Sequence, residues 1–556
     1  MAPSAASSPI VATRIDGDTE RHLHRKTSQA IDEGHDADIP SSEGYIQKST
    51  RTYDDNYDVE KAEEAGDMPT NDISTDDETE TSPNIVWWDG PNDPENPYNW
   101  PMWRKALSCS LISAMTFVSP LASSVFAPGV PQVLEEFHTT SLEIAAFVVS
   151  VYVLGFAAGP LLVAPLSEIY GRVPVYHACM VGFVAFAVAC ALAPSMNSLI
   201  GFRFLCGVFG SAPLSNGGGT IADMVRQENR AAVIAAYSVG PLLGPVIGPI
   251  AGGALTEAAG WRWTFWLLAI AGGVLMVLMF FLMQESYAPV LLQRKVHRLQ
   301  RETGNNLLRS KLDAGLSPAD FFKRGIIRPV KMFIRSPIVN ILALYTAVTY
   351  GYLYLMFTTM TEVFQETYGF STSTVGLSFL GLGVGSLAGV AIFSATSDRY
   401  IQRKAAQADR MAEITSSPSA GMKPEYRLPL LPLGAATIPL GLFIYGWTAE
   451  YHVHWIAPII GTGLVGVGNL IIFMGVQTYL VDAYTIYAAS ALATNTIVRS
   501  IAGAVLPLAG LKMYARLGLG WGNSLLAFIA IGLLPVSFIL IRYGEHLRTR
   551  FVIKNL

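Results

Sequence analysis

Long apolar runs dominate the chain from about residue 106 onward, and polar stretches separate them. Each run is about twenty residues long, which is the length that a helix needs to cross the hydrocarbon core of a bilayer. The pattern therefore predicts twelve membrane-spanning segments, near residues 106–126, 142–164, 174–194, 198–222, 231–255, 263–283, 338–360, 374–396, 429–449, 455–481, 488–511 and 522–542.

Two polar connections are much longer than the others: one follows the sixth segment and covers about 284–336, and one follows the eighth and covers about 397–428. The first divides the membrane body into six plus six segments. We therefore expect an all-α polytopic membrane protein with a six-helix bundle in each half. The predicted parts are an N-terminal bundle at 98–283, a central loop at 284–336, a C-terminal bundle at 337–545 and a tail at 546–556.

Composition and charge support this division. Only 15% of the residues are charged, against about 25% in an ordinary soluble domain. Residues 1–97 contain 23 acidic and 7 basic residues and few apolar ones. Such a segment buries too little apolar surface to fold, so we expect a disordered acidic tail. The remainder of the chain carries 20 acidic and 31 basic residues.

The positions of the basic residues predict the orientation. If the N-terminus is cytoplasmic, 26 of the 31 basic residues after residue 97 lie on the cytoplasmic side. An excess of Lys and Arg in cytoplasmic loops is the usual rule for membrane proteins. We therefore expect both termini and the central loop in the cytoplasm. The basic residues outside this set are Arg262, Lys512 and Arg516 in external loops and Arg203 and Arg499 within the membrane.

The fifth segment carries a glycine ladder, which we define as Gly240, Gly244, Gly248 and Gly252, with Pro245, Pro249 and Gly253 interleaved. Residues four apart share one helix face, and glycine lets a neighbouring backbone approach closely. The eighth segment offers a similar face at Gly381, Gly385 and Gly389. We predict that these two faces cross at the interface between the halves. The ladder then serves either as packing alone or as a hinge and seal of a transport cycle.

The two halves also repeat short motifs. Ser167-Glu168-Ile169-Tyr170 follows the second segment, and Ser397-Asp398-Arg399-Tyr400 follows the eighth. Asp223 ends the fourth segment, and Asp482 ends the tenth. Parallel repeats of this kind are typical of transporters that bind their substrate between two halves.

Several motifs together resemble one family over about residues 90–545. They are Gly244-x3-Gly248-Pro249-x2-Gly252-Gly253 in segment five, Asp93-Pro94-Glu95-Asn96-Pro97-Tyr98-Asn99-Trp100 before segment one, Tyr170-Gly171-Arg172 after segment two and Arg203-x3-Gly207 in segment four. The chain resembles the major facilitator superfamily, and within it the twelve-helix drug:proton antiporters of fungi. The resemblance implies the two-bundle fold, export of a drug, toxin or secondary metabolite, and the proton as coupling ion.

The same resemblance implies a cytoplasmic latch, by which we mean charged residues that close that side against the other half. Its candidates are Glu168, Gly171, Arg172 and Asp223, with Asp398 and Arg399 as a weaker second copy. Charges at helix ends can pair with each other and with helix termini. We expect Asp223 to pair with Arg172. The alternative is ordinary solvated charge at the membrane surface.

Two arginines lie inside predicted segments, where an ionisable side chain is costly and is a candidate for function. For Arg203 the resemblance implies a part in proton coupling or in binding an anionic part of the substrate, and the alternative is a structural arginine bonded to backbone carbonyls. Arg499, with Asn495 one turn away on the same face, has the same alternatives. Acidic residues are nearly absent from the segment interiors, so proton coupling rests mainly on the resemblance.

A central cavity is expected between segments one, four, seven and ten. Aromatic and neutral polar side chains in such a cavity suit a bulky, largely apolar organic ligand. For part of the set the alternative is an anchor at the lipid interface. The candidates are Ser215, Asn216, Tyr345, Thr349, Tyr350, Asn469, Phe473 and Gln477.

Other classes of function lack support in the sequence. There is no Gly-x4-Gly-Lys-Ser/Thr run, which disfavours ATP-driven pumping. The histidines form no metal cluster, and no cofactor or enzyme activity is expected. The basic central loop fits anionic membrane lipid better than nucleic acid. We expect a monomer in the plasma membrane rather than in an internal membrane, and the alternatives for function are uptake of a nutrient or polyamine, or a membrane sensor.

Overall fold

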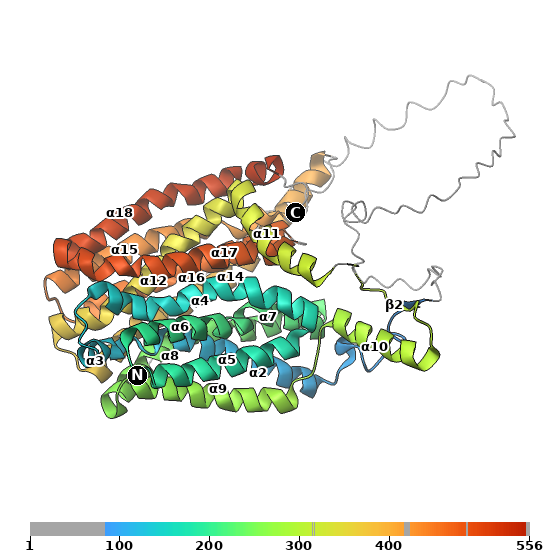
Figure 1. The fold of residues 1–556 in the computed structure, drawn as a ribbon. Helices are drawn as coiled ribbons and strands as arrows, with labels where there is room; N and C mark the ends of the chain where they lie inside the picture. The colour runs from blue at the N-terminus through green and yellow to red at the C-terminus, as the bar shows by residue number, and fades with distance from the viewer. Residues whose placement is uncertain (1–83, 314, 316, 416–422, 485–486, 552–556) are drawn as a thin grey trace, which may run out of the picture. The chain divides into compact units, whose positions relative to one another are not determined.

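The computed structural model describes residues 84–313, 315, 317–415, 423–484 and 487–551 (Figure 1). Most of the predicted tail, residues 1–83, lies outside the described residues. The longer helices are α2 (Met102–Ser124), α4 (Leu142–Tyr170), α5 (Arg172–Ala191), α6 (Met196–Gly210), α7 (Ala212–Met224), α8 (Gln227–Ala259), α9 (Arg262–Leu282), α10 (Ala288–Thr303), α11 (Pro318–Arg335), α12 (Pro337–Tyr368), α14 (Leu380–Thr415), α15 (Leu431–Glu450), α16 (Ile456–Tyr484), α17 (Ala488–Val505) and α18 (Pro507–Arg550). The short elements are β1 (Ile85–Val86), η1 (Pro97–Asn99), η2 (Ala127–Gly129), α3 (Val130–Glu136), α13 (Thr372–Ser378), β2 (Arg309–Ser310) and η3 (Pro424–Arg427).

The number of spans agrees with the apolar pattern. The described residues contain eleven helical stretches that are long and apolar enough to cross a membrane. The last of them, Ala488–Arg550, has 63 residues and is therefore too long for one crossing. Gly518 has φ +75° and interrupts it. This stretch consequently supplies the eleventh and twelfth predicted segments.

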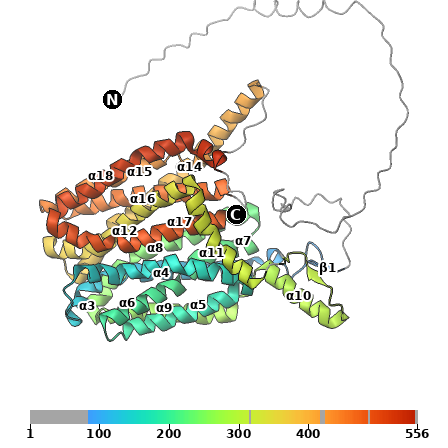
Figure 2. The same cartoon turned by 45° about the horizontal axis from the view of Figure 1, so that its top comes forward.

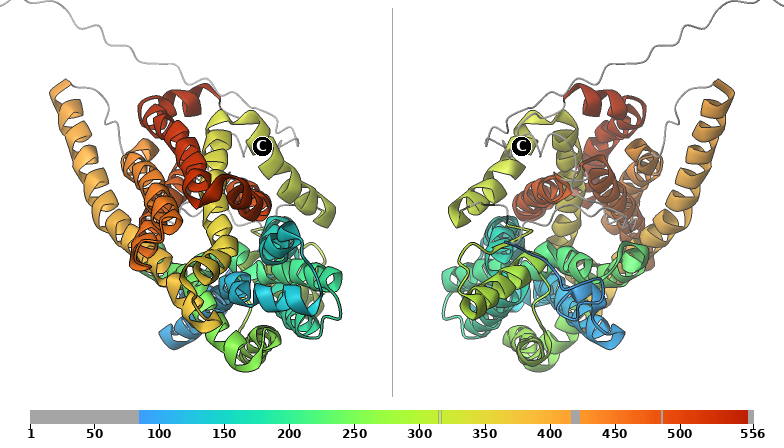
Figure 3. Two further views of the ribbon diagram at one scale, coloured as in Figure 1. Left: turned by 90° about the vertical axis from the view of Figure 1, so that its left-hand side faces the viewer. Right: turned by 90° about the vertical axis from the view of Figure 1, so that its right-hand side faces the viewer.

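The spans form two groups that match the predicted halves. Helices α2 to α9 lie together, and α12 to α18 lie beside them (Figures 1 and 2). A view nearly along the helices shows the two groups side by side (Figure 3). The C-terminal half has one large apolar core that includes Tyr352, Phe364 and Tyr479. The N-terminal half has two separate apolar cores, and the first of them includes Tyr152 and Phe265.

The ends of the helices follow from local sequence. Ser141 and Ser336 accept hydrogen bonds from the amides of Ile144 and Val339, which caps α4 and α12. Gly171 is the only residue between α4 and α5 and has φ +100°. Because a side chain is strained in that conformation, glycine permits this abrupt reversal.

Short breaks divide several of the described spans, among them the fourth, the eighth and the eleventh. The fourth consists of α6 and α7, the eighth of α13 and α14, and the eleventh of α17 and the start of α18. In the fourth and the eleventh, a proline occupies the first turn of the second helix, at Pro213 and Pro507. Proline is tolerated there because the N–H groups of the first helical turn have no acceptor within the helix, so its missing N–H group breaks no hydrogen bond.

Residues 84–100 are ordered. The prediction of disorder is therefore wrong for the C-terminal end of the tail, residues 84–97. Strand β1 pairs in parallel with β2 of the central loop. The Lys295 ammonium in α10 binds Asp93 at 3.3 Å. Burial alone would raise the pKa of Asp93, but hydrogen bonds from the Asp89 and Glu95 amides and from Lys295 hold it below its ordinary value. These contacts attach the segment to α10, so the proposed tail is shorter than 1–97.

The polar connections are also more helical than their composition predicts. The central loop contains α10 and α11, and α14 continues to Thr415, well beyond residue 396. The last helix runs to Arg550. The described part of the predicted tail at 546–556 is therefore mostly helical. We use the term linker end for the end of the spans at which α4 ends and α11 packs, and far end for the opposite one, where α2 ends.

Candidate functional site

The glycine ladder packs on the first span, not on the eighth. A Cβ atom at Gly240 would lie 3.0 Å from the Phe117 amide nitrogen of α2, and one at Gly244 would lie 2.8 Å from the Leu121 nitrogen. Cβ atoms at Gly248 and Gly252 would overlap Ser124 and Val125. The prediction of a partner in segment eight is therefore wrong for this face. The ladder brings the α8 and α2 backbones together within one half.

The glycines of the eighth span have a different partner as well. Cβ atoms at Gly381, Gly385 and Gly389 would meet the carbonyl oxygens of Ile459, Gly463 and Val467 in α16. Both glycine faces thus join helices of the same half. Sequence spacing shows that a face allows close approach but does not identify the helix that approaches.

Spans five and eight do meet, through other positions. A Cβ atom at Gly253 would lie 2.6 Å from the Thr372 carbonyl oxygen, and one at Gly376 would lie 2.5 Å from that of Pro249. Pro245 and Pro249 lie inside α8, which continues through both. The predicted contact between the halves therefore exists, and its close-packed members are Gly253 and Gly376 rather than the ladder glycines.

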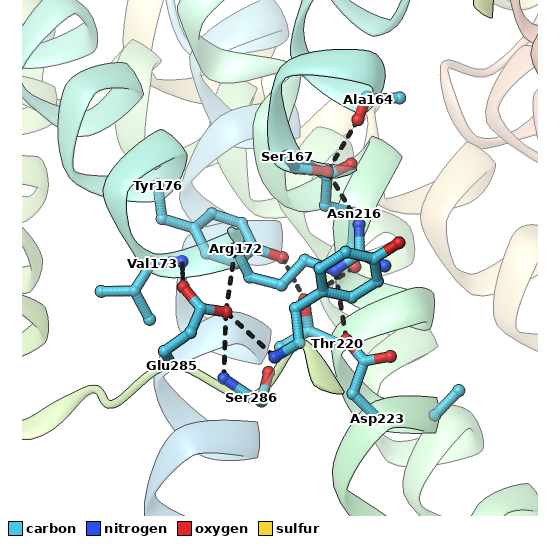
Figure 4. Close-up of polar contacts among 12 residues, drawn as sticks. Ala164, Ser167, Arg172, Val173, Tyr176, Asn216, Thr220, Asp223, Glu285 and Ser286 are labelled. Atoms are coloured by element: carbon cyan, nitrogen blue, oxygen red, sulfur yellow. Dashed lines mark hydrogen bonds and ion pairs between the residues drawn. The ribbon is translucent and has the colours of Figure 1, made fainter. Parts of the chain in front are cut away.

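The linker end of the N-terminal half contains a buried network around Arg172 (Figure 4). The Arg172 Nε atom donates to Asp223 Oδ2 at 3.1 Å, and its Nη1 atom donates to Ser167 Oγ at 2.7 Å. The guanidinium also lies over the Tyr287 ring at 4.5 Å. Burial raises the pKa of Tyr287 to about 12, so this ring stays neutral. The network thus contains the predicted Arg172–Asp223 pair, and it connects the second, third and fourth spans.

Glu285 completes this network and was missed in the sequence. It is 7% exposed. Its carboxylate accepts hydrogen bonds from the amides of Arg172, Val173, Ser286 and Tyr287, and it therefore caps the N-terminus of α5. A Cβ atom at Gly171 would overlap this carboxylate, so the network needs glycine there. The available signal was an acidic residue directly after the sixth apolar run. Glu168, in contrast, is exposed and forms no ion pair within 4 Å of another described residue, although the charges of Arg172 and Arg328 act on its carboxylate.

The C-terminal half has a counterpart, but with a different arginine from the predicted one. Arg427, which begins the ninth span, binds Asp482 at the end of the tenth at 2.8 Å. This arrangement matches Arg172 at the start of the third span and Asp223 at the end of the fourth. Arg399 is exposed, and the side chain of Asp398 lies outside the described residues. Arg427 therefore replaces Arg399 as the arginine of the second copy.

Arg203 is enclosed near the far end of the N-terminal half. It is 1% exposed, and its Nη2 atom donates to the carbonyl oxygens of Val149 and Ser123 at 3.2 and 3.4 Å. The guanidinium also lies 4.8 Å from the ring centre of Phe126 and 5.5 Å from that of Phe265. These contacts match the structural alternative, in which the arginine joins the first, second and fourth spans.

Arg499 has different surroundings. Its guanidinium lies 4.6 Å from the ring centre of Tyr350 in α12 and 4.8 Å from that of Phe473 in α16. Asn495 lies one turn before it, is fully buried and accepts a hydrogen bond from Thr346. We use the term Arg499 cluster for Tyr350, Phe473, Gln477, Asn495 and Arg499. The fold thus assembles two predicted cavity aromatics around a predicted functional arginine.

The other predicted cavity residues have partners of their own or are buried. Tyr345 is buried, and its hydroxyl bonds with Ser537 Oγ in α18 at 3.1 Å, so its assignment to the cavity is wrong. The Asn469 amide donates to the Thr349 carbonyl oxygen at 2.7 Å and joins α16 to α12. In the other half, Ser215 Oγ donates to its own helix, while Asn216 is buried.

Side-chain contacts join the two halves at or toward the far end. Tyr354 donates to Ser123 Oγ at 3.0 Å. Ser150 Oγ donates to the Ala504 carbonyl oxygen at 2.9 Å. The remaining hydrogen bonds and ion pairs between the spans of the two halves, among the described residues, join Glu257 to the Ser373 amide and Lys512 to Glu143. The polar contacts thus hold the halves together on the far side of the Arg499 cluster.

Comparison with known proteins relates this chain to one family of transporters. The model of the Major Facilitator Superfamily matches residues 112–507. The chain is 57% identical over 469 residues to the MFS-type transporter tndD of Aspergillus flavipes, with 84% of this chain and 86% of that protein covered. It is 51% identical over 479 residues to the efflux pump radE of Floropilus chiversii, with 86% and 87% covered.

Solved structures share the fold at low sequence identity. The Escherichia coli xylose transporter XylE, in a partially occluded inward-open conformation, superposes with a TM-score of 0.59 at 14% identity. The comparison covers 79% of this chain and 98% of that one. The two bundles, the motifs and the relatives agree, and this chain is a multi-pass membrane transporter that belongs to the Major Facilitator Superfamily.

Proposed function

We propose that this transporter exports a small, largely apolar organic compound, such as a fungal secondary metabolite, in exchange for protons. The observation that carries the proposal is the Arg499 cluster: aromatic and polar groups gather at mid-depth in the C-terminal half. Tyr350 is 13 residues from the start of α12, and Arg499 is 11 from the start of α17. At about 1.5 Å per residue these positions lie near the middle of a bilayer.

Alternating access supplies the mechanism. The far-end contacts hold the halves together on one side, so we infer that the described state admits a ligand from the linker end. Export then requires the halves to rock, which breaks contacts such as Tyr354–Ser123 and closes the linker end. The Arg172–Asp223 and Arg427–Asp482 pairs each stabilise one half at that end, and we propose that both halves meet there in the opposite state.

The direction of transport depends on which end faces the cytoplasm. We place the linker end there, because the basic residues concentrate in the connections at that end. The relatives support export over uptake of a nutrient or polyamine, because one is named an efflux pump. We further propose a monomer in the plasma membrane.

Membrane lipid is a second expected partner. On α11, Val330 and Ile334 are 51% and 74% exposed, beside the basic residues Lys331 and Arg335. An apolar face flanked by cations fits the boundary between acyl chains and anionic headgroups. We therefore propose that α11 rests on the cytoplasmic surface of the bilayer.

Proteoliposomes provide the test. Flux of naphthalene-2-sulfonate, an aromatic anion that crosses lipid slowly, is measured in vesicles with an imposed pH gradient and in protein-free vesicles. We expect protein-dependent flux that stops when an ionophore exchanging potassium for protons collapses the gradient. Protein-dependent flux that ignores the gradient would refute proton exchange, and the absence of such flux would count against export of aromatic compounds.

A further inference from the structure

The Arg499 guanidinium is stacked between two aromatic rings, one from α12 and one from α16. Cation–π contacts stabilise the faces of a guanidinium, but they leave its N–H groups, which lie at the edge, without acceptors. No hydrogen bond or ion pair joins Arg499 to another described residue, and its Nε atom is buried without a partner. The side chain is only partly buried. A cation at this depth normally has a counter-charge or carbonyl acceptors.

Two further polar groups of the cluster also lack a hydrogen-bond partner. The Asn495 Nδ2 and Gln477 Oε1 atoms are buried and have no hydrogen-bond partner. Asn495 is fully buried, and its Oδ1 atom is already used by Thr346. Buried polar groups are nearly always paired, because an unpaired one loses the hydrogen bonds that water would supply. One donor in α17 and one acceptor in α16 therefore remain unpaired among the described residues, on the same two helices that carry Arg499 and Phe473.

The surrounding helices explain where these groups are directed. Asn495 and Arg499 are four residues apart and share a face of α17, and Phe473 and Gln477 share a face of α16. Helix α17 also packs on α4 of the other half, as shown by the Ser150–Ala504 hydrogen bond. A guanidinium does not face hydrocarbon at mid-depth. The unpaired groups hence belong to the interior between the halves, where a transported ligand passes.

We propose that Arg499, Asn495 and Gln477 form a polar subsite that binds organic anions with a flat, conjugated body. The oxyanion of the ligand accepts hydrogen bonds from Arg499 and Asn495, and a hydroxyl or N–H group of the ligand donates to Gln477 Oε1. Tyr350 and Phe473 hold the guanidinium and contact the conjugated body. This inference rests on the proposed function and names the substrate class of the same site.

Binding measurements on the purified protein test the charge preference. The probes are naphthalene-2-sulfonate and the neutral naphthalene-2-sulfonamide, which have nearly the same shape, and affinity is measured by calorimetry. We expect the wild type to bind the sulfonate at least about tenfold more tightly, which is the scale of one hydrogen bond to a charged group. Arg499→Gln should lose this preference and keep its affinity for the sulfonamide.

Two further variants control for charge and folding. Arg499→Lys keeps the cation and should retain part of the preference. Arg516→Gln removes an equal charge from an exposed position and should behave like the wild type. Equal affinity of the wild type for the two probes would overturn the inference whether or not the Arg499 variants fold. A preference that survives in Arg499→Gln would overturn it as well.

Binding and flux together separate this inference from the export proposal. A protein that prefers the sulfonate through Arg499 but does not move it across the membrane keeps the subsite and refutes export. A protein that moves both probes equally keeps export and refutes the subsite.

Discussion

Arg203 and Arg499 are the same residue type in comparable places, and the fold uses them differently. Each lies inside a spanning helix with its guanidinium over aromatic rings. Both have a buried Nε atom without a partner, but Arg203 is enclosed and its Nη2 atom is bonded to two backbone carbonyls, whereas Arg499 is partly exposed and has no acceptor among the described residues. An arginine within the membrane thus becomes structural when carbonyls reach it, and stays available to a ligand when aromatic rings alone surround it.

The packing of the neighbouring helices accounts for the difference. A Cβ atom at Gly155 of α4 would lie 2.5 Å from the Phe204 carbonyl oxygen, so α4 and α6 approach at backbone distance around Arg203. Carbonyl oxygens of nearby spans are then within reach. Around Arg499, the Tyr350 and Phe473 rings flank the guanidinium, and no hydrogen bond joins it to a carbonyl of a described residue. Backbone carbonyls therefore reach Arg203, whereas aromatic rings flank Arg499.

The largest loss of stability is expected for Arg203→Gln. The shorter side chain removes the hydrogen bonds to the Ser123 and Val149 carbonyls and creates a cavity among aromatic rings. We expect the free energy of unfolding to fall by about 2–4 kcal/mol, measured by thermal unfolding of the purified protein. Arg203→Lys is the control, because it keeps one donor and should lose less. A stable Arg203→Gln protein with normal unfolding but no proton-coupled flux would instead assign Arg203 to coupling.

Gly248→Leu tests the support of the same site. Its side chain would overlap Ser124 and push α2 away from α8, which displaces the neighbouring Ser123 carbonyl that Arg203 binds. Overpacking of this kind costs about 1–3 kcal/mol, and flux should fall with it. Gly273→Leu in α9 is the matched control, because a Cβ atom there meets nothing within 4 Å. Equal stability of the two variants would contradict the close packing of α8 on α2.

Much of this arrangement could be predicted from sequence, and the reasons for the failures are physical. Apolar length determines how many times the chain crosses the bilayer, so the spans and the division into halves followed directly. The Arg172–Asp223 pair also followed, because both residues lie at helix ends on one side. The ladder partner did not, since a glycine face fits any close backbone. Arg427 was missed as the partner of Asp482, because the fold, not the spacing, brings the start of span nine to the end of span ten.

The cluster around Arg499 could also be predicted only in part from sequence. Sequence identified Phe473 and Gln477 by their spacing of four in segment ten. It identified Asn495 by its place one turn from Arg499, and Tyr350 as one of the aromatic residues of segment seven. It also included Tyr345, whose hydroxyl instead bonds with Ser537. A helix has several faces, and only packing against α18 decides that this tyrosine faces away from the cluster.

Tyr354→Phe should have a smaller effect, on conformation rather than folding. It removes the hydrogen bond from Tyr354 to Ser123 Oγ at 3.0 Å, which joins the two halves beside Arg203. One such bond is worth about 1 kcal/mol, so the ratio of open to closed far ends should rise about fivefold. Spin labels at Thr140 and Tyr451, in a variant without native cysteines, would report this distance. Tyr368→Phe removes a bond within one half and should leave the distribution unchanged.

Arg499→Gln should have the smallest effect on stability and the opposite sign. Because no described residue pairs with the Arg499 guanidinium, its removal eliminates the desolvation of an unpaired cation and breaks no hydrogen bond. We expect the free energy of unfolding to stay the same or rise by up to about 1 kcal/mol, while flux of naphthalene-2-sulfonate falls about tenfold. Thermal unfolding and proteoliposome flux, measured on the same preparations, check the two parts. A loss of stability as large as that of Arg203→Gln would show that Arg499 is also structural and would remove the difference between the two arginines.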